Sequence, residues 1–156
     1  MIKVFIDQGH NPANPNAGAE GNGLREQDLV YEIGVRLAAL LNADPEFEAR
    51  LSRNSPTEIL GETTAQSLRA RTDAANSWGT DIFISLHANA STITSASGSE
   101  GLVYKIPSAA YTLSEDILTE LSLATGLQDR GTTARPGLYV LRKTTMPAVL
   151  VELGFI

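Results

Sequence analysis

Four side chains of this sequence have the types and positions that metal-assisted hydrolysis needs. The two histidines of the chain, His10 and His87, each follow a short apolar run that is typical of a buried strand. Glu26 opens an amphipathic segment, and Glu152 lies in the apolar run near the C-terminus. Two histidines and one carboxylate are a known ligand set of catalytic zinc sites, which keep a fourth position for water. A carboxylate that is not a ligand can pass the proton of that water to a leaving amine.

Each of these residues also has a simpler explanation. A histidine in a loop is commonly a surface residue, and Glu26 at a helix start could serve the helix dipole. Glu152 lies in an apolar run, where a carboxylate needs a metal, a raised pKa or a partner such as an arginine. No short His-Glu-x-x-His motif is present, so spacing alone does not select zinc. The sequence also lacks a Gly-x-Ser-x-Gly nucleophile motif and a Gly-x-x-x-x-Gly-Lys phosphate loop.

Alternating strands and helices are predicted to position these residues. Apolar runs predict strands at 2–7, 47–52, 81–86, 102–106, 138–141 and 148–152, and helical periodicity predicts helices at 25–42, 65–78 and 113–125. This alternation predicts an α/β domain of three layers, with a six-stranded, mixed and mostly parallel sheet flanked by helices. Open α/β sheets bind ligands beyond the carboxyl ends of their strands. His10, His87 and Glu152 at strand ends, and Glu26 at a helix start, can therefore converge at one edge.

Length and composition exclude several classes of protein. The chain has 156 residues, 42% hydrophobic and 19% charged, which fits one globular domain and argues against disorder. No run approaches the roughly 18 apolar residues of a membrane span. The absence of cysteine excludes disulfides, thiolate metal sites and cysteine nucleophiles. A net charge of −6 argues against nucleic-acid partners and anionic membranes.

Several short motifs occur together in a fixed order. They are Ile-Asp-Gln-Gly-His (6–10), Gly-Ala-Glu-Gly-Asn-Gly-Leu-Arg-Glu (18–26), Leu-Ser-Arg (51–53), Leu-Arg-Ala-Arg-Thr-Asp-Ala-Ala-Asn (68–76), Ser-Leu-His-Ala-Asn-Ala (85–90) and Val-Glu-Leu-Gly-Phe-Ile (151–156). Each motif is weak alone, but the ordered set is specific. With this set the whole chain closely resembles the zinc-dependent N-acetylmuramoyl-L-alanine amidases of the amidase type 3 family, which cut bacterial peptidoglycan.

The resemblance implies a role for each of the four residues. His10, Glu26 and His87 match the three zinc ligands of the family, and Glu152 matches its catalytic glutamate. Glu20 is a competing carboxylate in the same loop as Glu26, but it does not stand at the ligand position. Three further matches, Arg53, Arg71 and Asn76, are interpreted as structural residues that hold loops or helix ends.

The implied reaction is hydrolysis of the amide between the lactyl group of N-acetylmuramic acid and the L-Ala of the stem peptide. Peptidoglycan is then the partner, in the cell wall or outside the cell, and the protein is expected to be a monomer. The first residues show no export signal, which a phage lysin released from the cytoplasm would not need. Two alternatives remain open: a zinc peptidase that cuts another stem-peptide bond, and a catalytically silent wall-binding module.

The resemblance also sets an expectation for the domain. Residues 1–156 are expected to form a single amidase catalytic domain. Members of the family usually continue past the Gly-Phe-Ile segment with a loop and a final helix that packs on the sheet, and this sequence ends at Ile156. One face of the sheet is therefore expected to be covered only in part. The need for an activator or a separate wall-binding domain is left open.

Overall fold

The computed structural model describes residues 1–156, and most of its strands form one sheet. The elements in chain order are β1 (Ile2–Gln8), β2 (Glu20–Gly21), β3 (Leu24–Arg25), α1 (Glu26–Asn42), β4 (Phe47–Leu51), α2 (Thr64–Trp78), β5 (Ile82–Asn89), β6 (Ser99–Val103), α3 (Ala109–Thr125), β7 (Asp129–Ala134), α4 (Tyr139–Lys143) and β8 (Ala148–Phe155). The main sheet has six strands in the order β4-β1-β5-β8-β6-β7, and β2 and β3 form a separate hairpin. Neighbouring strands of the main sheet are parallel except β6 and β8, which are antiparallel. The predicted fold class is confirmed.

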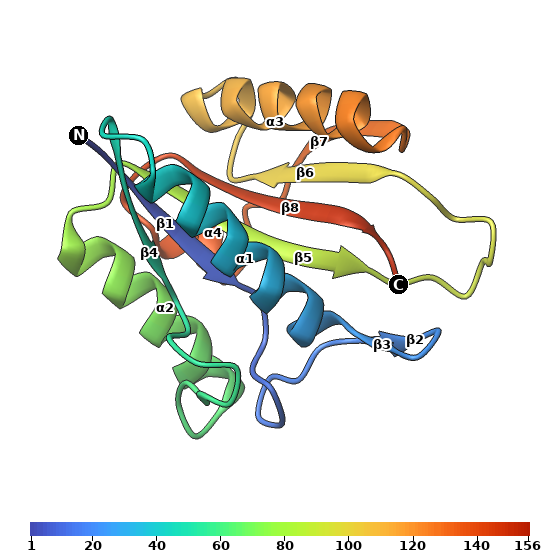
Figure 1. Ribbon diagram of the computed structural model, residues 1–156, viewed down its shortest axis with the longest axis horizontal. Coiled ribbons are helices and arrows are strands. Elements are labelled where there is room, and N and C mark those ends of the chain that lie inside the picture. The colour runs from blue at the N-terminus through green and yellow to red at the C-terminus, as the bar shows by residue number, and fades with distance from the viewer.

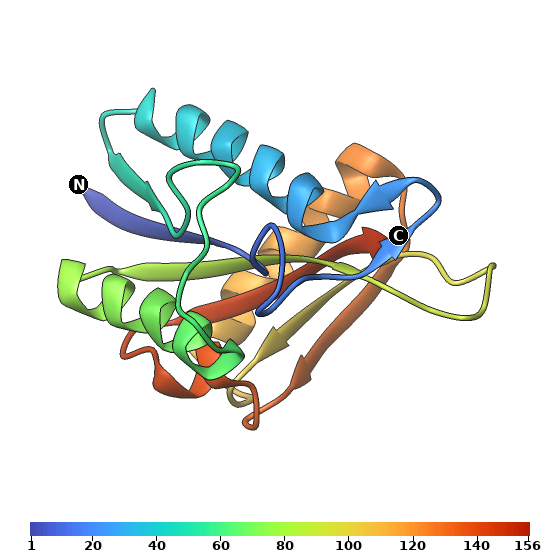
Figure 2. The same ribbon diagram turned by 90° about the horizontal axis from the view of Figure 1, so that it is seen from below.

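Helices cover both faces of this sheet (Figure 1). Turned by 90°, the molecule shows α1 on one side of the sheet and α2 with α4 on the other (Figure 2). Helix α3 packs on β6, β7 and β8, on the same face as α1. None of the helices combines the length and the continuous apolar surface that crossing a lipid bilayer requires.

Strand β8 shows how the sequence specifies these layers. Ala148 and Leu150 pack in the core cluster beneath α2 and α4, whereas Val149 and Val151 pack in the cluster beneath α3. Burial of a Val or Leu side chain stabilises the fold by about 1.5–3 kcal/mol. A shift of one residue would exchange these two sets of apolar side chains and move the carboxylate of Glu152 to the apolar face beneath α3, and the cost of burying it there opposes the shift.

Helix ends are also fixed locally. Thr63 caps α2 by accepting a hydrogen bond from the backbone N–H of Gln66, and Gly79 ends that helix in the left-handed conformation. Ser108 accepts a bond from the backbone N–H of Tyr111 and caps α3 in the same way. Helix α1 has no side-chain cap, but its first turn carries Glu26 and Asp28, which the helix dipole favours.

One sequence-based prediction of an element is wrong, and one strand is missing from the prediction. The predicted strand at 138–141 is the short helix α4, and the sixth strand of the sheet is β7, for which the sequence predicts no element. Val140 and Leu141 of α4 are buried in the core cluster, and a short apolar run cannot distinguish a strand from a buried helix. Strand β7 lies at the sheet edge with the sequence Asp-Arg-Gly-Thr-Thr-Ala, which has no alternating apolar pattern. Strand β6 spans Ser99–Val103, whereas the sequence predicts a strand at 102–106.

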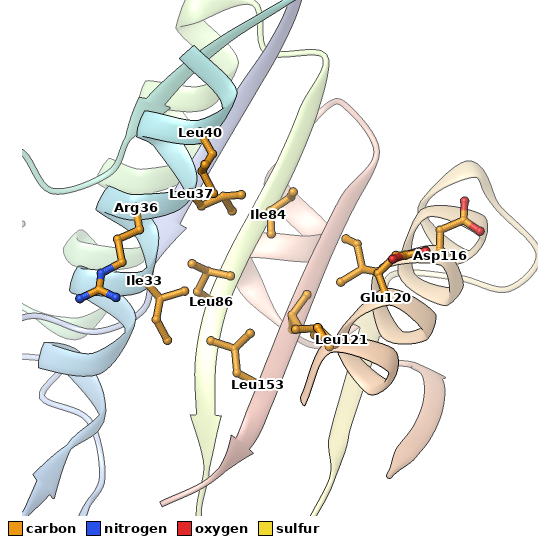
Figure 3. A pocket seen from close by; sticks show the side chains of 13 residues that line it. Ile33, Arg36, Leu37, Leu40, Ile84, Leu86, Asp116, Glu120, Leu121 and Leu153 are labelled. Atoms are coloured by element: carbon orange, nitrogen blue, oxygen red, sulfur yellow. The ribbon is translucent and has the colours of Figure 1, made fainter. Parts of the chain in front are cut away.

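An apolar groove opens on the face that α1 and α3 cover (Figure 3). Leucine and isoleucine side chains from α1, β5, β8 and α3 line a volume of about 650 Å³. Leu40 of α1, at one side of the groove, is 72% exposed, so the two helices leave part of this face open. The groove lies away from the two histidines, which belong to a different, smaller cavity.

Candidate metal centre

Three chain segments meet at the carboxyl edge of the central strands. His10 follows β1, His87 lies near the end of β5, and Glu26 is the first residue of α1. Strands β1 and β5 pair in parallel up to Gln8 and Leu86, and the rings of His10 and His87, which follow these residues, lie with their centroids 5.0 Å apart. The ends of β5 and β8 and the β2–β3 hairpin lie at the same side of the molecule (Figure 2). The sequence-based expectation that these residues converge is correct.

Glu26 is the centre of this arrangement. Its Oε1 lies 3.1 Å from His10 Nε2 and 3.2 Å from His87 Nδ1. The backbone N–H of Ala88 donates to the same oxygen, and the N–H of Ala19 donates to Oε2. One donor atom from each of the two histidines and the glutamate lies within 4.8 Å of the others, so the three side chains could hold one metal ion.

The charge of Glu26 fits this interpretation. Burial alone would raise the pKa of its carboxyl, but hydrogen bonds with His10 and His87 and with the Ala19 N–H hold the pKa well below its usual range. The carboxylate is therefore ionised while only 4% exposed. A buried anion between two imidazole nitrogens is the donor set that a divalent cation such as zinc accepts. These residues fit a metal ion.

Glu152 faces the same site from β8. It pairs with His87 across the parallel β5–β8 ladder and with Glu100 across the antiparallel β6–β8 ladder. Its Oε2 is buried without a hydrogen-bond partner. Burial raises the pKa of Glu152, and the nearby Glu26 and Glu100 carboxylates raise it further, although His87 opposes the shift. No arginine forms an ion pair with Glu152, so an arginine partner does not explain why this carboxylate lies in an apolar strand.

The approach of the two histidines requires an unusual backbone. His10 has φ +66° and is the only residue other than asparagine or glycine with a left-handed backbone. Such a conformation costs on the order of 1–3 kcal/mol. Gly9, which precedes it, packs so tightly that an added Cβ would lie 2.6 Å from His87 Cε1 and from the Leu86 carbonyl oxygen. The turn after β1 is thus shaped around the second histidine.

A buried ion pair lies beneath the site. Asp7 Oδ1 accepts a hydrogen bond of 2.7 Å from Arg71 of α2, and Asp7 Oδ2 accepts one of 2.7 Å from Ser85 of β5. Burial would raise the pKa of Asp7, but Arg71 and Ser85 together hold the pKa below its ordinary value. Sequence reasoning did not select Asp7 or Ser85. An aspartate inside an apolar run is a signal that it needs a partner, but it does not identify that partner.

The other expected residues have structural contacts. Arg53 is fully buried and donates to the Gln27 carbonyl with 2.7 Å, directly after Glu26. Asn76 accepts from the Thr145 N–H and donates to the Lys143 carbonyl, which holds the connection between α4 and β8. Glu20 lies in the β2–β3 hairpin with a side chain that is 67% exposed and pairs with Arg25. It is not among the residues that surround the two histidines.

The architecture and the comparisons with known proteins agree on one family. The structure is an α/β domain that gathers two histidines and two glutamates at the carboxyl edge of its sheet, and it has a candidate metal centre. The chain belongs to the N-acetylmuramoyl-L-alanine amidase family (Amidase_3), whose profile matches residues 4–156. The family that the sequence motifs indicate is therefore confirmed.

Individual relatives agree with this membership. A sporulation-specific N-acetylmuramoyl-L-alanine amidase of Bacillus subtilis is 37% identical over 158 residues, which cover 100% of this chain and 57% of that protein. The endolysin of Bacillus phage SPP1 is 33% identical, over 98% of this chain and 54% of that protein. The chain thus spans a little over half the length of these curated relatives.

Solved structures have the same fold. The catalytic domain of CwlV, an N-acetylmuramoyl-L-alanine amidase from Bacillus (Paenibacillus) polymyxa, superimposes with a TM-score of 0.85 at 30% identity. That match covers 99% of this chain and 81% of the other. An N-acetylmuramoyl-L-alanine amidase from Clostridium difficile 630 also gives 0.85 at 30% identity, with 99% and 80% coverage.

Proposed function

We propose that residues 1–156 form the catalytic domain of a zinc-dependent N-acetylmuramoyl-L-alanine amidase. The reaction is hydrolysis of the amide between the lactyl group of N-acetylmuramic acid and L-Ala in peptidoglycan. The observation that carries the proposal is the buried Glu26 carboxylate, 3.1 and 3.2 Å from the two histidine nitrogens, with Glu152 next to His87 across the ladder. The family membership supports the choice of substrate.

His10, Glu26 and His87 would hold the metal. A zinc ion there would polarise the amide carbonyl and lower the pKa of a water molecule. The His10 and His87 imidazoles must be neutral to serve as ligands, so acid is expected to release the ion. The hydrogen bonds from the Ala19 and Ala88 backbone support this role, because they keep the Glu26 carboxylate oriented before any ion arrives.

Glu152 is the catalytic residue in this proposal. It takes a proton from the attacking water and gives it to the L-Ala nitrogen, which leaves as an amine when the C–N bond breaks. The oxygen of the water stays on the lactyl carbonyl carbon, which becomes a carboxylate. A raised pKa suits this work, because the same carboxyl must accept and release a proton near neutral pH.

The proposed substrate supports a proposed location. Two relatives are named as a sporulation-specific N-acetylmuramoyl-L-alanine amidase and a phage endolysin. We therefore expect this domain to act as a monomer on peptidoglycan in the cell wall or outside the cell.

The test is to incubate the zinc-loaded protein with purified peptidoglycan and to label newly formed amino termini. New N-terminal L-Ala that disappears with a chelator and returns with zinc would support the amidase. New termini of another residue would contradict it in favour of a zinc peptidase. A protein that holds zinc but creates no termini would contradict it in favour of a silent wall-binding module.

A further inference from the structure

His10 has a left-handed backbone conformation, with φ +66°. Histidine and asparagine adopt this region more often than other residues with a Cβ, but it is uncommon even for them. The conformation still costs energy, so contacts from the surrounding structure must hold it. The source of that constraint is therefore part of how the site is built.

One side chain of α2 bonds to the backbone of this turn at two carbonyl groups. Arg71 is 1% exposed, and its Nη2 donates a hydrogen bond of 2.7 Å to the backbone carbonyl oxygen of His10. Nη1 of the same guanidinium donates to the carbonyl oxygen of Gln8, two residues earlier. A planar guanidinium offers several donors in a fixed arrangement, so these two bonds set the carbonyl directions on both sides of Gly9.

The same guanidinium is also connected to the strand that carries the second histidine. Asp7 bridges Arg71 and the hydroxyl of Ser85, with 2.7 Å on each side. Ser85 precedes His87 by two residues on β5. One buried network therefore links α2 to the backbone of His10 and to the strand of His87.

We propose that Arg71 is a positioning residue for the metal centre: by bonding the His10 carbonyl it holds the His10 imidazole beside Glu26 and His87. Arg71 forms no hydrogen bond with the side chains of His10, Glu26 or His87, and its direct bond to these residues is with the His10 backbone carbonyl. The inference rests on the proposed function, because it assumes that these three residues hold a metal ion.

The test is the affinity of the purified chain for zinc, measured by competition with a coloured chelator. The R71K variant keeps a cation beside Asp7 but cannot form the same set of bonds. Changes to groups that orient a ligand typically cost about 10–100-fold in metal affinity, and we expect a weakening of that size. The R69K variant is the matched control, because Arg69 lies on the same helix with a side chain that is 73% exposed.

A spectroscopic measurement separates positioning from general destabilisation. The chain has only two histidines, so the imidazole NMR signals of the metal-free protein report on His10 and His87 alone. We expect R71K to shift the His10 signals at a temperature where the variant is fully folded. A folded R71K with unchanged His10 signals and a zinc affinity within twofold of the unaltered chain would overturn the inference.

A measurement on the unaltered chain covers the case in which R71K does not fold. The Nη protons of Arg71 should exchange slowly with water in the metal-free protein, and should change little when zinc is added. Rapid exchange in the metal-free protein would overturn the inference, because the loop would then be ordered by the ion. If the unaltered chain binds no zinc, the proposed metal site itself fails, which is a different result.

Discussion

Replacing Glu26 with glutamine tests whether its carboxylate is the shared ligand. In the metal-free protein both carboxylate oxygens accept backbone hydrogen bonds, from Ala19 and Ala88. An amide has only one acceptor oxygen, so E26Q leaves one buried N–H without a partner, at a cost of about 1–3 kcal/mol. The same change removes the anionic ligand. We therefore expect a moderate loss of stability and a much larger loss of zinc affinity.

The two effects can be separated by thermal unfolding with and without zinc. A ligand at 100 times its Kd stabilises the folded state by about 2.7 kcal/mol. For a domain of this size that raises Tm by roughly 5–11 °C, since each kcal/mol is worth about 2–4 °C. The unaltered chain should show this rise, and E26Q should not.

The matched control is Glu20, an exposed carboxylate in the hairpin that precedes Glu26. E20Q should keep the rise in Tm that zinc gives to the unaltered chain. If E26Q were stabilised by zinc as much as E20Q, the reasoning that places the ion at the buried carboxylate would be refuted.

Three further predictions concern the proposed catalytic residue Glu152, the turn after β1 and the buried ion pair. E152Q should lower turnover by about 10²–10⁴-fold while zinc affinity stays within about threefold, and unchanged turnover on purified peptidoglycan would argue against its role. G9A should lower the free energy of unfolding in urea by about 1–3 kcal/mol, because its Cβ would lie 2.6 Å from Cε1 of His87. G137A is the control and should lower it far less, because a Cβ at that position meets nothing within 4 Å. The pKa of Asp7 is lowered on folding from 3.8, so its ionised form stabilises the protein above that pH and the contribution is lost as the pH falls. D7N leaves Arg71 without its buried anionic partner, so it should lower the free energy of unfolding by about 3–5 kcal/mol near pH 7. It should also make Tm depend less on pH below about 4. The same dependence of Tm on acid pH in D7N and the unaltered chain would contradict the role of Asp7.

The sequence is sufficient to predict the central strands but not the edge of the sheet. Strands β1, β5 and β8 lie inside the sheet, with residues of β1 and of the first half of β8 buried on both faces, so they read as continuous apolar runs. Strand β7 is half exposed and has only one neighbour, so its residues are under no comparable constraint. The apolar run of helix α4 is also typical of a strand. Tertiary packing decides whether such a short run is a helix or a strand, and sequence periodicity carries no information about that packing.

The sequence likewise predicts some features of the candidate site and not others. The positions of His10, His87 and Glu152 at strand ends follow from apolar patterning, and the ordered motifs match Glu26 to a zinc-ligand position of the family. The positive φ of His10 and the bonds from Arg71 could not be predicted, because they connect residues about 60 positions apart. Such contacts depend on how α2 docks on the sheet, and no local pattern specifies that.

The identity of the cut bond is tested most directly by hydrolysis in water enriched in ¹⁸O. The substrate would be a defined muramoyl peptide that begins with L-Ala, and the products would be separated by mass spectrometry. We expect one ¹⁸O atom in the new lactyl carboxylate of the muramic acid product and a free amine on L-Ala. An ¹⁸O atom in a carboxylate of the released peptide, with the lactyl amide intact, would contradict it.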